Sequence, residues 1–108
     1  MNILFVCSVN IDRSKTAEKH FSTKYPQHKF RSAGTNFKLC KNSGSTPVDI
    51  SLINWANEII VMEEKHARVI LDIAKEDLSN ILNVLNISDD FEYMSPDLIA
   101  ILNQKVQF

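Results

Sequence analysis

Cysteine is scarce in this sequence, and its scarcity excludes one common way of stabilising a small protein. The 108 residues include two cysteines, Cys7 and Cys40, which lie far apart in the chain. Two distant cysteines give no disulfide framework. Hydrophobic residues make up 44% of the chain, which is enough to bury a real core without such a framework. We expect a single domain over residues 1–108, close to the commonest domain size.

Long apolar runs are also missing, and we expect no leader peptide. No apolar run is long enough to cross a bilayer. The chain starts with strand-like residues, where a signal peptide would have a charged and then an apolar region. We therefore expect a cytoplasmic protein, in a compartment that keeps thiols reduced.

Neither sign of charge is in large excess. The formal net charge is −1 at pH 7, so electrostatics give no case for a nucleic acid or a membrane surface as partner. The histidines are scattered along the chain, at His20, His28 and His66. We expect neither a metal site nor a cofactor.

Apolar runs and helical patterns alternate along the chain. Short apolar runs predict strands, at 2–6, 28–33, 58–62 and 81–85. Cap residues and apolar stripes predict helices, at 13–21, 46–55, 63–75 and after Ser95, whereas the polar stretch 36–45 is typical of a loop. This alternation favours a three-layer α/β fold, with a four-stranded parallel sheet flanked by helices and joined by right-handed crossovers.

The loop after the first predicted strand combines a cysteine with an arginine. Cys7 stands six residues before Arg13, between a strand end and a helix start. Backbone N–H groups and the helix dipole at such a turn attract negative charge, which favours a thiolate. Arg13 adds a planar fork of donors that fits two phosphate oxygens, and the Ser14 hydroxyl can donate to the thiolate. The loop therefore predicts a phosphate-binding site and phosphoryl transfer through a cysteine nucleophile.

This loop and three later segments resemble the low-molecular-weight protein tyrosine phosphatases, in particular a short bacterial branch. The run Cys-Ser-Val-Asn-Ile-Asp-Arg-Ser at 7–14 is similar to the phosphate loop of that family. Arg-Ser-Ala-Gly-Thr at 31–35 is similar to its second strand, residues 55–63 to its third strand, and residues 89–96 to its acid loop and final helix. The resemblance covers nearly the whole chain.

The resemblance implies a phosphoric monoester hydrolase. Cys7 would attack phosphorus and form a covalent cysteinyl-phosphate, while Arg13 and the loop amides hold the phosphate oxygens. The substrate would be a phosphotyrosine-containing protein or a small aryl phosphate, and free phosphate or another oxyanion would fit the same loop. The implied substrate-binding residues of the loop are Ser8, Val9, Asn10, Ile11, Asp12 and Ser14.

The general acid is less clearly marked. The family pattern is Asp-Pro-aromatic, and here Asp89, Asp90 and Phe91 follow one another without the proline. Aligning the aromatic residue on Phe91 makes Asp89 the acid that protonates the leaving group, with Asp90 as the alternative. We expect Phe91 to line the pocket and to stack on the phenyl ring of the substrate.

Asp12 departs from the family pattern, and Cys40 lies outside the motif. Asp12 replaces a second loop cysteine that in many family members can form a protective disulfide with the nucleophile. We expect the Asp12 side chain to cap the helix that follows. Cys40 is expected to be a free surface thiol. The brief loop at 36–45 predicts a shallower and less selective pocket than in longer family members.

Other functions fit parts of the pattern. An arsenate reductase with this loop needs two further cysteines, and only Cys40 is present. A phosphocarrier should not stabilise hydrolysis, and Arg13 argues against it. A phosphotyrosine-binding protein with little turnover is the remaining alternative, because the acid loop is irregular.

Overall fold

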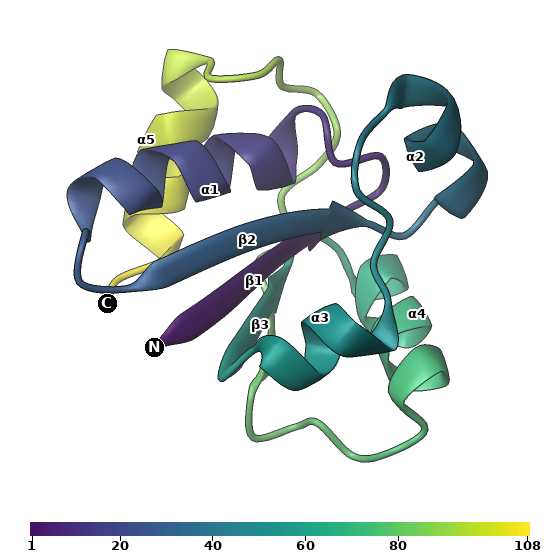
Figure 1. The fold of residues 1–108 in the computed structure, drawn as a ribbon. Helices are drawn as coiled ribbons and strands as arrows, with labels where there is room; N and C mark the ends of the chain where they lie inside the picture. Colours follow the sequence, from purple (N-terminus) through teal and green to yellow (C-terminus); the bar gives the residue numbers. More distant parts are fainter.

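A parallel sheet of four strands forms the centre of the molecule (Figure 1). The computed structural model describes residues 1–108. Its strands are β1 (Asn2–Cys7), β2 (Lys29–Gly34), β3 (Glu58–Val61) and β4 (Leu82–Val84). They lie in the order β2-β1-β3-β4, and every neighbouring pair is parallel. The predicted parallel α/β sheet is confirmed, with β1 as a central strand.

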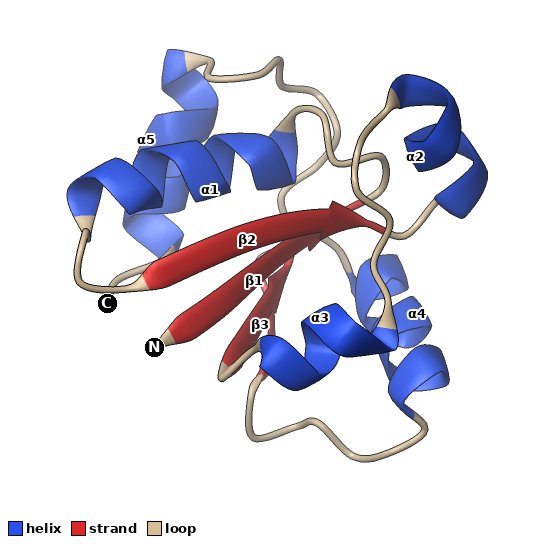
Figure 2. Cartoon of the chain, in the orientation of Figure 1, coloured by secondary structure: helices blue, strands red, loops and turns tan.

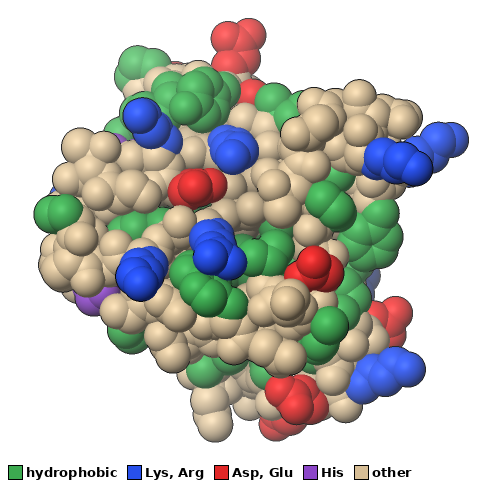
Figure 3. All heavy atoms as spheres, viewed as in Figure 1, with side chains coloured by type: hydrophobic (Ala, Val, Ile, Leu, Met, Phe, Trp, Pro, Cys, Tyr) green, Lys and Arg blue, Asp and Glu red, His purple; other side chains and the backbone are tan.

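Helices cover both faces of this sheet (Figures 1 and 2). One face carries α1 (Arg13–Lys24) and α5 (Pro96–Lys105), and the other carries α3 (Ile50–Trp55) and α4 (Glu64–Ala74). The short α2 (Phe37–Ser43) lies beyond the carboxyl end of β2. No helix here has the length and apolar character that crossing a membrane requires. Acidic and basic side chains are interspersed over the face seen in Figure 3, in keeping with a net charge of −1.

The central strand β1 is apolar at successive positions because both of its faces are buried. Ile3 and Phe5 join a core cluster with residues of α1 and α5. Leu4 and Val6 point to the other face and join a second cluster with residues of α3 and α4. The sheet is thus held from both sides, and the carboxyl end of β1 opens onto the loop that contains the predicted site.

The segment 36–45, predicted as a loop, contains helix α2. Asn36 begins this helix by accepting a hydrogen bond from the backbone N of Leu39 at 3.1 Å. Gly44 ends it in the left-handed conformation, with φ of 71°. Asparagine before a helix and glycine after it are helix-cap signals. The loop prediction used only the polar composition of the segment and did not take these two caps into account.

The helix expected from 46 onward begins later, at Ile50. Its cap is Asp49, whose side chain accepts a hydrogen bond from the backbone N of Leu52 at 2.9 Å. Pro47 pairs with Gly34 in an isolated parallel bridge, so it extends the sheet region and does not open a helix. The helix predicted after Ser95 is confirmed as α5.

Gly34 provides a test of how closely β2 approaches the loop after β1. A Cβ atom at this position would lie 2.6 Å from Cys40 Sγ and 2.7 Å from the carbonyl oxygen of Ser8. Gly34→Ala should therefore lower the free energy of unfolding by about 1–3 kcal/mol, as for other overpacked sites. It should also shift the amide resonances of Ser8 and Val9, because the loop must move away.

Gly44→Ala is the matched control, since it adds a Cβ with nothing within 4 Å but at a positive φ. It should lower stability through backbone strain alone, by about 1 kcal/mol, with shifts confined to α2. Urea unfolding and amide spectra of both variants check this. Loop resonances that stay in place in Gly34→Ala would contradict the close approach.

Candidate active site

The loop between β1 and α1 closes around the sulfur of Cys7. Asn10 takes a left-handed backbone with φ of 61°, as its residue type allows. Its backbone N donates to Cys7 Sγ at 3.3 Å, and its side-chain amide donates to Ser14 Oγ at 2.8 Å. Its side-chain oxygen accepts from the backbone N of Thr46 at 3.2 Å. Asn10 therefore fixes the shape of the loop from beneath.

Ser14 lies in contact with the sulfur. Cys7 Sγ is 3.0 Å from Ser14 Oγ, closer than the 3.5 Å that separates this hydroxyl from the carbonyl oxygen of Ala33. Because Ser14 already accepts from the Asn10 amide, its own proton is free to point at the sulfur. A hydroxyl and a backbone amide thus both offer a hydrogen bond to the sulfur.

Arg13 is the largest charged side chain in the interior, with 1% of its surface exposed. Its Nη1 donates to the Glu63 carboxylate and, at 2.8 Å, to the carbonyl oxygen of Ile87. Glu63 follows β3 and Ile87 follows β4, so this nitrogen joins the carboxyl ends of two strands to the start of α1. The guanidinium is thereby held rigidly in one orientation.

The other edge of the Arg13 guanidinium faces the loop. Nη2 is 3.5 Å from Ser8 Oγ. Nε is buried and makes no hydrogen bond within the protein, although Asp89 Oδ1 lies 3.4 Å away as a looser ion-pair contact. A buried donor without an acceptor is costly. Two phosphate oxygens would fit this edge as a bidentate acceptor.

His66, at the start of α4, supports the site from behind and is fully buried. Its Nδ1 accepts a hydrogen bond from the backbone N of Glu63 at 3.0 Å, so the neutral ring carries its proton on Nε2. Nε2 donates to Ser8 Oγ at 2.9 Å. Since His66 is the donor in this pair, it cannot act as a base toward Ser8, and the Ser8 hydroxyl proton stays free to point into the cavity.

Burial and charge set the protonation states of these supporting groups. The hydrogen bond from Arg13 lowers the pKa of Glu63, against the smaller opposing effect of burial. Burial, followed by the positive charge of Arg13, lowers the pKa of His66 to about 4. At neutral pH the site therefore holds a cation on Arg13, an anion on Glu63 and an uncharged imidazole.

A cavity of about 120 Å³ opens above the sulfur. It is lined by residues of the predicted site, namely Cys7, Ser8, Val9, Ile11, Asp12, Arg13 and Asp89. Asn10 and Ser14, predicted to bind substrate, are buried beneath the loop and shape it from below. No group of three or more histidine, cysteine, aspartate or glutamate side chains is arranged to hold a metal ion.

The acid loop places its two aspartates differently. Asp89 lines the cavity and is 68% exposed at the side chain. The Asp90 side chain accepts a hydrogen bond from Ser88 Oγ at 2.7 Å and does not line the cavity. Phe91 packs against the core cluster under α1 and α5, so the geometry does not support the expected stacking on a substrate ring.

Asp12 does not cap α1 with its side chain, contrary to the prediction. Its Oδ1 accepts a hydrogen bond from the backbone N of Tyr93 at 2.9 Å. Beside it, Thr16 Oγ1 accepts from the backbone N of Met94 at 2.8 Å. These two bonds attach the acid loop to the start of α1.

Cys40 is buried and not a surface thiol, which corrects the prediction. It lies in α2, and its Sγ is 3.4 Å from the carbonyl oxygen of Val9. Ser45 Oγ donates to the same oxygen. The two side chains tie the outer part of the phosphate loop to α2, and the sequence gives no sign of this contact.

Solved structures of low sequence identity share this architecture. The tyrosine phosphatase Wzb from Escherichia coli K30, in complex with phosphate, is 22% identical with a TM-score of 0.72, over 96% of this chain and 91% of that one. The low molecular weight protein tyrosine phosphatase from Bacillus subtilis is 23% identical with a TM-score of 0.65, over 79% and 70%. The chain has the fold of the low-molecular-weight protein tyrosine phosphatases.

The same fold also occurs in a phosphatase named for another substrate. The YwlE arginine phosphatase from Geobacillus stearothermophilus is 20% identical with a TM-score of 0.69, over 95% of this chain and 88% of that one. No protein-family model and no curated protein sequence matches this chain. These comparisons show the fold alone.

His66 makes the stability of this chain depend on pH. Its pKa is about 4 in the folded state, below the ordinary value of 6.5. The unfolded chain therefore takes up the proton first, and stability that is complete above pH 6.5 is lost as pH falls toward 4. Between these values the free energy of unfolding should fall by up to about 1.4 kcal/mol per pH unit for this one proton.

His66→Gln keeps a donor near Ser8 but cannot titrate, so it should flatten the slope between pH 6.5 and 5. Urea unfolding at several pH values compares this variant with the wild type. An unchanged slope in His66→Gln would show that His66 is not held neutral by its surroundings.

Proposed function

We propose that this chain is a protein tyrosine phosphatase that hydrolyses aryl phosphate monoesters through a cysteinyl-phosphate on Cys7. The observation that carries the proposal is the convergence on one cavity of the Cys7 sulfur, the Nε–Nη2 edge of the Arg13 guanidinium and the Asp89 carboxyl group. A nucleophile, an oxyanion cradle and an acid are the parts that such a reaction needs.

In the first step, the Cys7 thiolate attacks phosphorus and a sulfur–phosphorus bond forms. The bond between phosphorus and the phenol oxygen breaks, and the leaving oxygen takes a proton from the Asp89 carboxyl group. The loop amides and the Nε–Nη2 edge of Arg13 hold the three outer oxygens through the transition state. Ser14 stabilises the thiolate from which the reaction starts.

In the second step, the Asp89 carboxylate removes a proton from a water molecule. The water oxygen attacks phosphorus, the sulfur–phosphorus bond breaks, and phosphate leaves while Cys7 returns to its thiolate. The exposed position of Asp89 suits both steps, since this side chain borders solvent and the cavity at once. Asp90 is turned to Ser88 and is less suited to this role.

The lining of the cavity favours an aryl substrate. Val9 and Ile11 border it with aliphatic side chains, and Ile11 is 45% exposed. A phenyl ring gains from such apolar contact. We therefore assign phosphotyrosine, in a protein or as a small aryl phosphate, as the substrate class.

Replacement of the nucleophile gives the most direct test of this assignment. Cys7→Ser should reduce hydrolysis of an aryl phosphate to the uncatalysed level, because a serine hydroxyl here has no base to ionise it. Binding of phosphate, measured by calorimetry, should persist because Arg13 and the loop amides remain. The control Cys40→Ser, which removes the other thiol, should retain turnover. Full activity in Cys7→Ser would exclude the proposed mechanism.

Replacement of each aspartate separates the two candidates for the acid. Asp89→Ala should slow turnover on the order of 10²–10⁴-fold for poor leaving groups, with a smaller effect as the leaving group becomes a better one. Asp90→Ala should keep the leaving-group dependence of the wild type. The measurement is kcat for a series of substituted phenyl phosphates.

Other results of this series would change the assignment. If only Asp90→Ala lowers kcat for substrates with poor leaving groups, the acid is Asp90. If neither variant differs from wild type and turnover is low throughout, the chain is better described as a phosphotyrosine-binding protein.

A further inference from the structure

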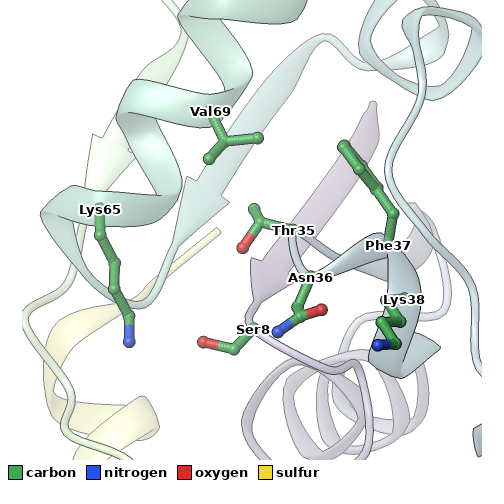
Figure 4. Close-up of a pocket in the computed structure, with 7 residues that line it drawn as sticks. All are labelled: Ser8, Thr35, Asn36, Phe37, Lys38, Lys65 and Val69. Carbon is green, nitrogen blue, oxygen red and sulfur yellow. The ribbon is translucent and has the colours of Figure 1, made fainter.

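A wide groove adjoins the phosphate cavity (Figure 4). Its volume is about 620 Å³, and Ser8 is the only residue that lines both hollows. Phe37 and Lys38 border the groove from the start of α2, and Lys65 and Val69 border it from α4. Figure 4 shows Lys65 and Lys38 on the two sides of Ser8.

The charge of the groove differs from that of the cavity. The cavity is lined by two aspartates, Asp12 and Asp89, beside the buried Arg13, whereas the groove is lined by two lysines and by no acidic residue. Lys38 is exposed and forms neither an ion pair nor a side-chain hydrogen bond. The acidic side chains therefore lie on the cavity side of Ser8, and the exposed lysines lie on its groove side.

Lys65 forms only a long ion pair with Glu63. Its Nζ lies 3.9 Å from the Glu63 carboxylate, which is bound much more closely by Arg13. The Lys65 side chain is 61% exposed. A second anion in the groove can therefore attract Lys65 without competing for the contact that orients Arg13.

We propose that this groove binds an acidic side chain that flanks the phosphotyrosine of a peptide substrate, an inference that rests on the proposed phosphatase function. With the phosphoryl group above Cys7, the neighbouring residues of the peptide lie about 3.4 Å apart along the chain and pass Ser8. The aliphatic stem of a glutamate can contact Phe37 and Val69 while its carboxylate approaches Lys38 and Lys65. Charge complementarity then selects acidic sequences over neutral ones.

The test compares two phosphotyrosine peptides that differ only in having Glu or Gln on both sides of the phosphotyrosine. The quantity of interest is the ratio of kcat/KM for the Glu peptide to that for the Gln peptide, measured on the same variant so that a general change in turnover cancels. Two exposed ion pairs predict a ratio of about two- to tenfold in the wild type. The ratio should fall toward one in high salt, because exposed charges are screened.

Variants locate the effect in the groove. Lys38→Gln and Lys65→Gln should each reduce the ratio, and the double variant should bring it close to one. Lys41→Gln is the matched control, because Lys41 also lies in α2 and has the same charge but does not line the groove. It should keep the ratio of the wild type.

A wild-type ratio near one, or a ratio that persists in the double lysine variant, would overturn the groove assignment. Failure of the proposed function has a different signature, namely no turnover of either peptide or of a simple aryl phosphate. In that case the dissociation constants of labelled Glu and Gln peptides are measured on Cys7→Ser. A ratio of these constants near one, or a ratio that persists when both lysines are also replaced, would overturn the groove assignment.

Discussion

The buried guanidinium of Arg13 is the interaction on which the site depends. A charge in the interior is stable only when it is paired and hydrogen-bonded, and here its partners come from three separate segments. Glu63 after β3, the carbonyl of Ile87 after β4 and the loop after β1 all contact this one side chain. Because these segments follow parallel strands, their meeting at one edge is a direct consequence of the sheet order.

The same contacts give the two sides of the guanidinium different roles. Nη1 is occupied by the protein, and the Nε–Nη2 edge is turned toward the cavity. Such a division positions the donors before any oxyanion arrives, so little reorganisation is needed during reaction. The neutral His66 contributes in the same way, since it orients Ser8 without adding a second positive charge beside Arg13.

Features set by short stretches of sequence could be predicted. The turn from β1 to α1 brings Cys7, Arg13 and Ser14 together because their spacing spans one loop, and the Ser95 cap needs only its own helix. The partners of Arg13 could not be predicted in this way. Glu63 looks like an ordinary helix start until β3 is known to lie beside β1, and His66 looks like one scattered histidine until burial is known.

The corrections have the same origin. Asp12 has the residue type of a helix cap, but the acid loop, distant in sequence, offers its side chain a backbone donor at Tyr93. Cys40 lies in a polar stretch, yet the packing of α2 against the phosphate loop buries it. Phe91 aligns with a pocket residue and instead packs against the core. In each case a contact between distant segments decides the role of the residue.

Direct detection of the covalent intermediate is the measurement closest to the central claim. A single turnover of an aryl phosphate is quenched with denaturant at mildly alkaline pH, because acid hydrolyses the bond between sulfur and phosphorus, and all peptides of the digested chain are analysed by mass spectrometry. The account predicts one phosphoryl group on the sulfur of Cys7, formed at the rate at which the phenol is released. Release of the phenol with no phosphoryl group on the chain, or with the group on Ser8 or His66, would contradict it.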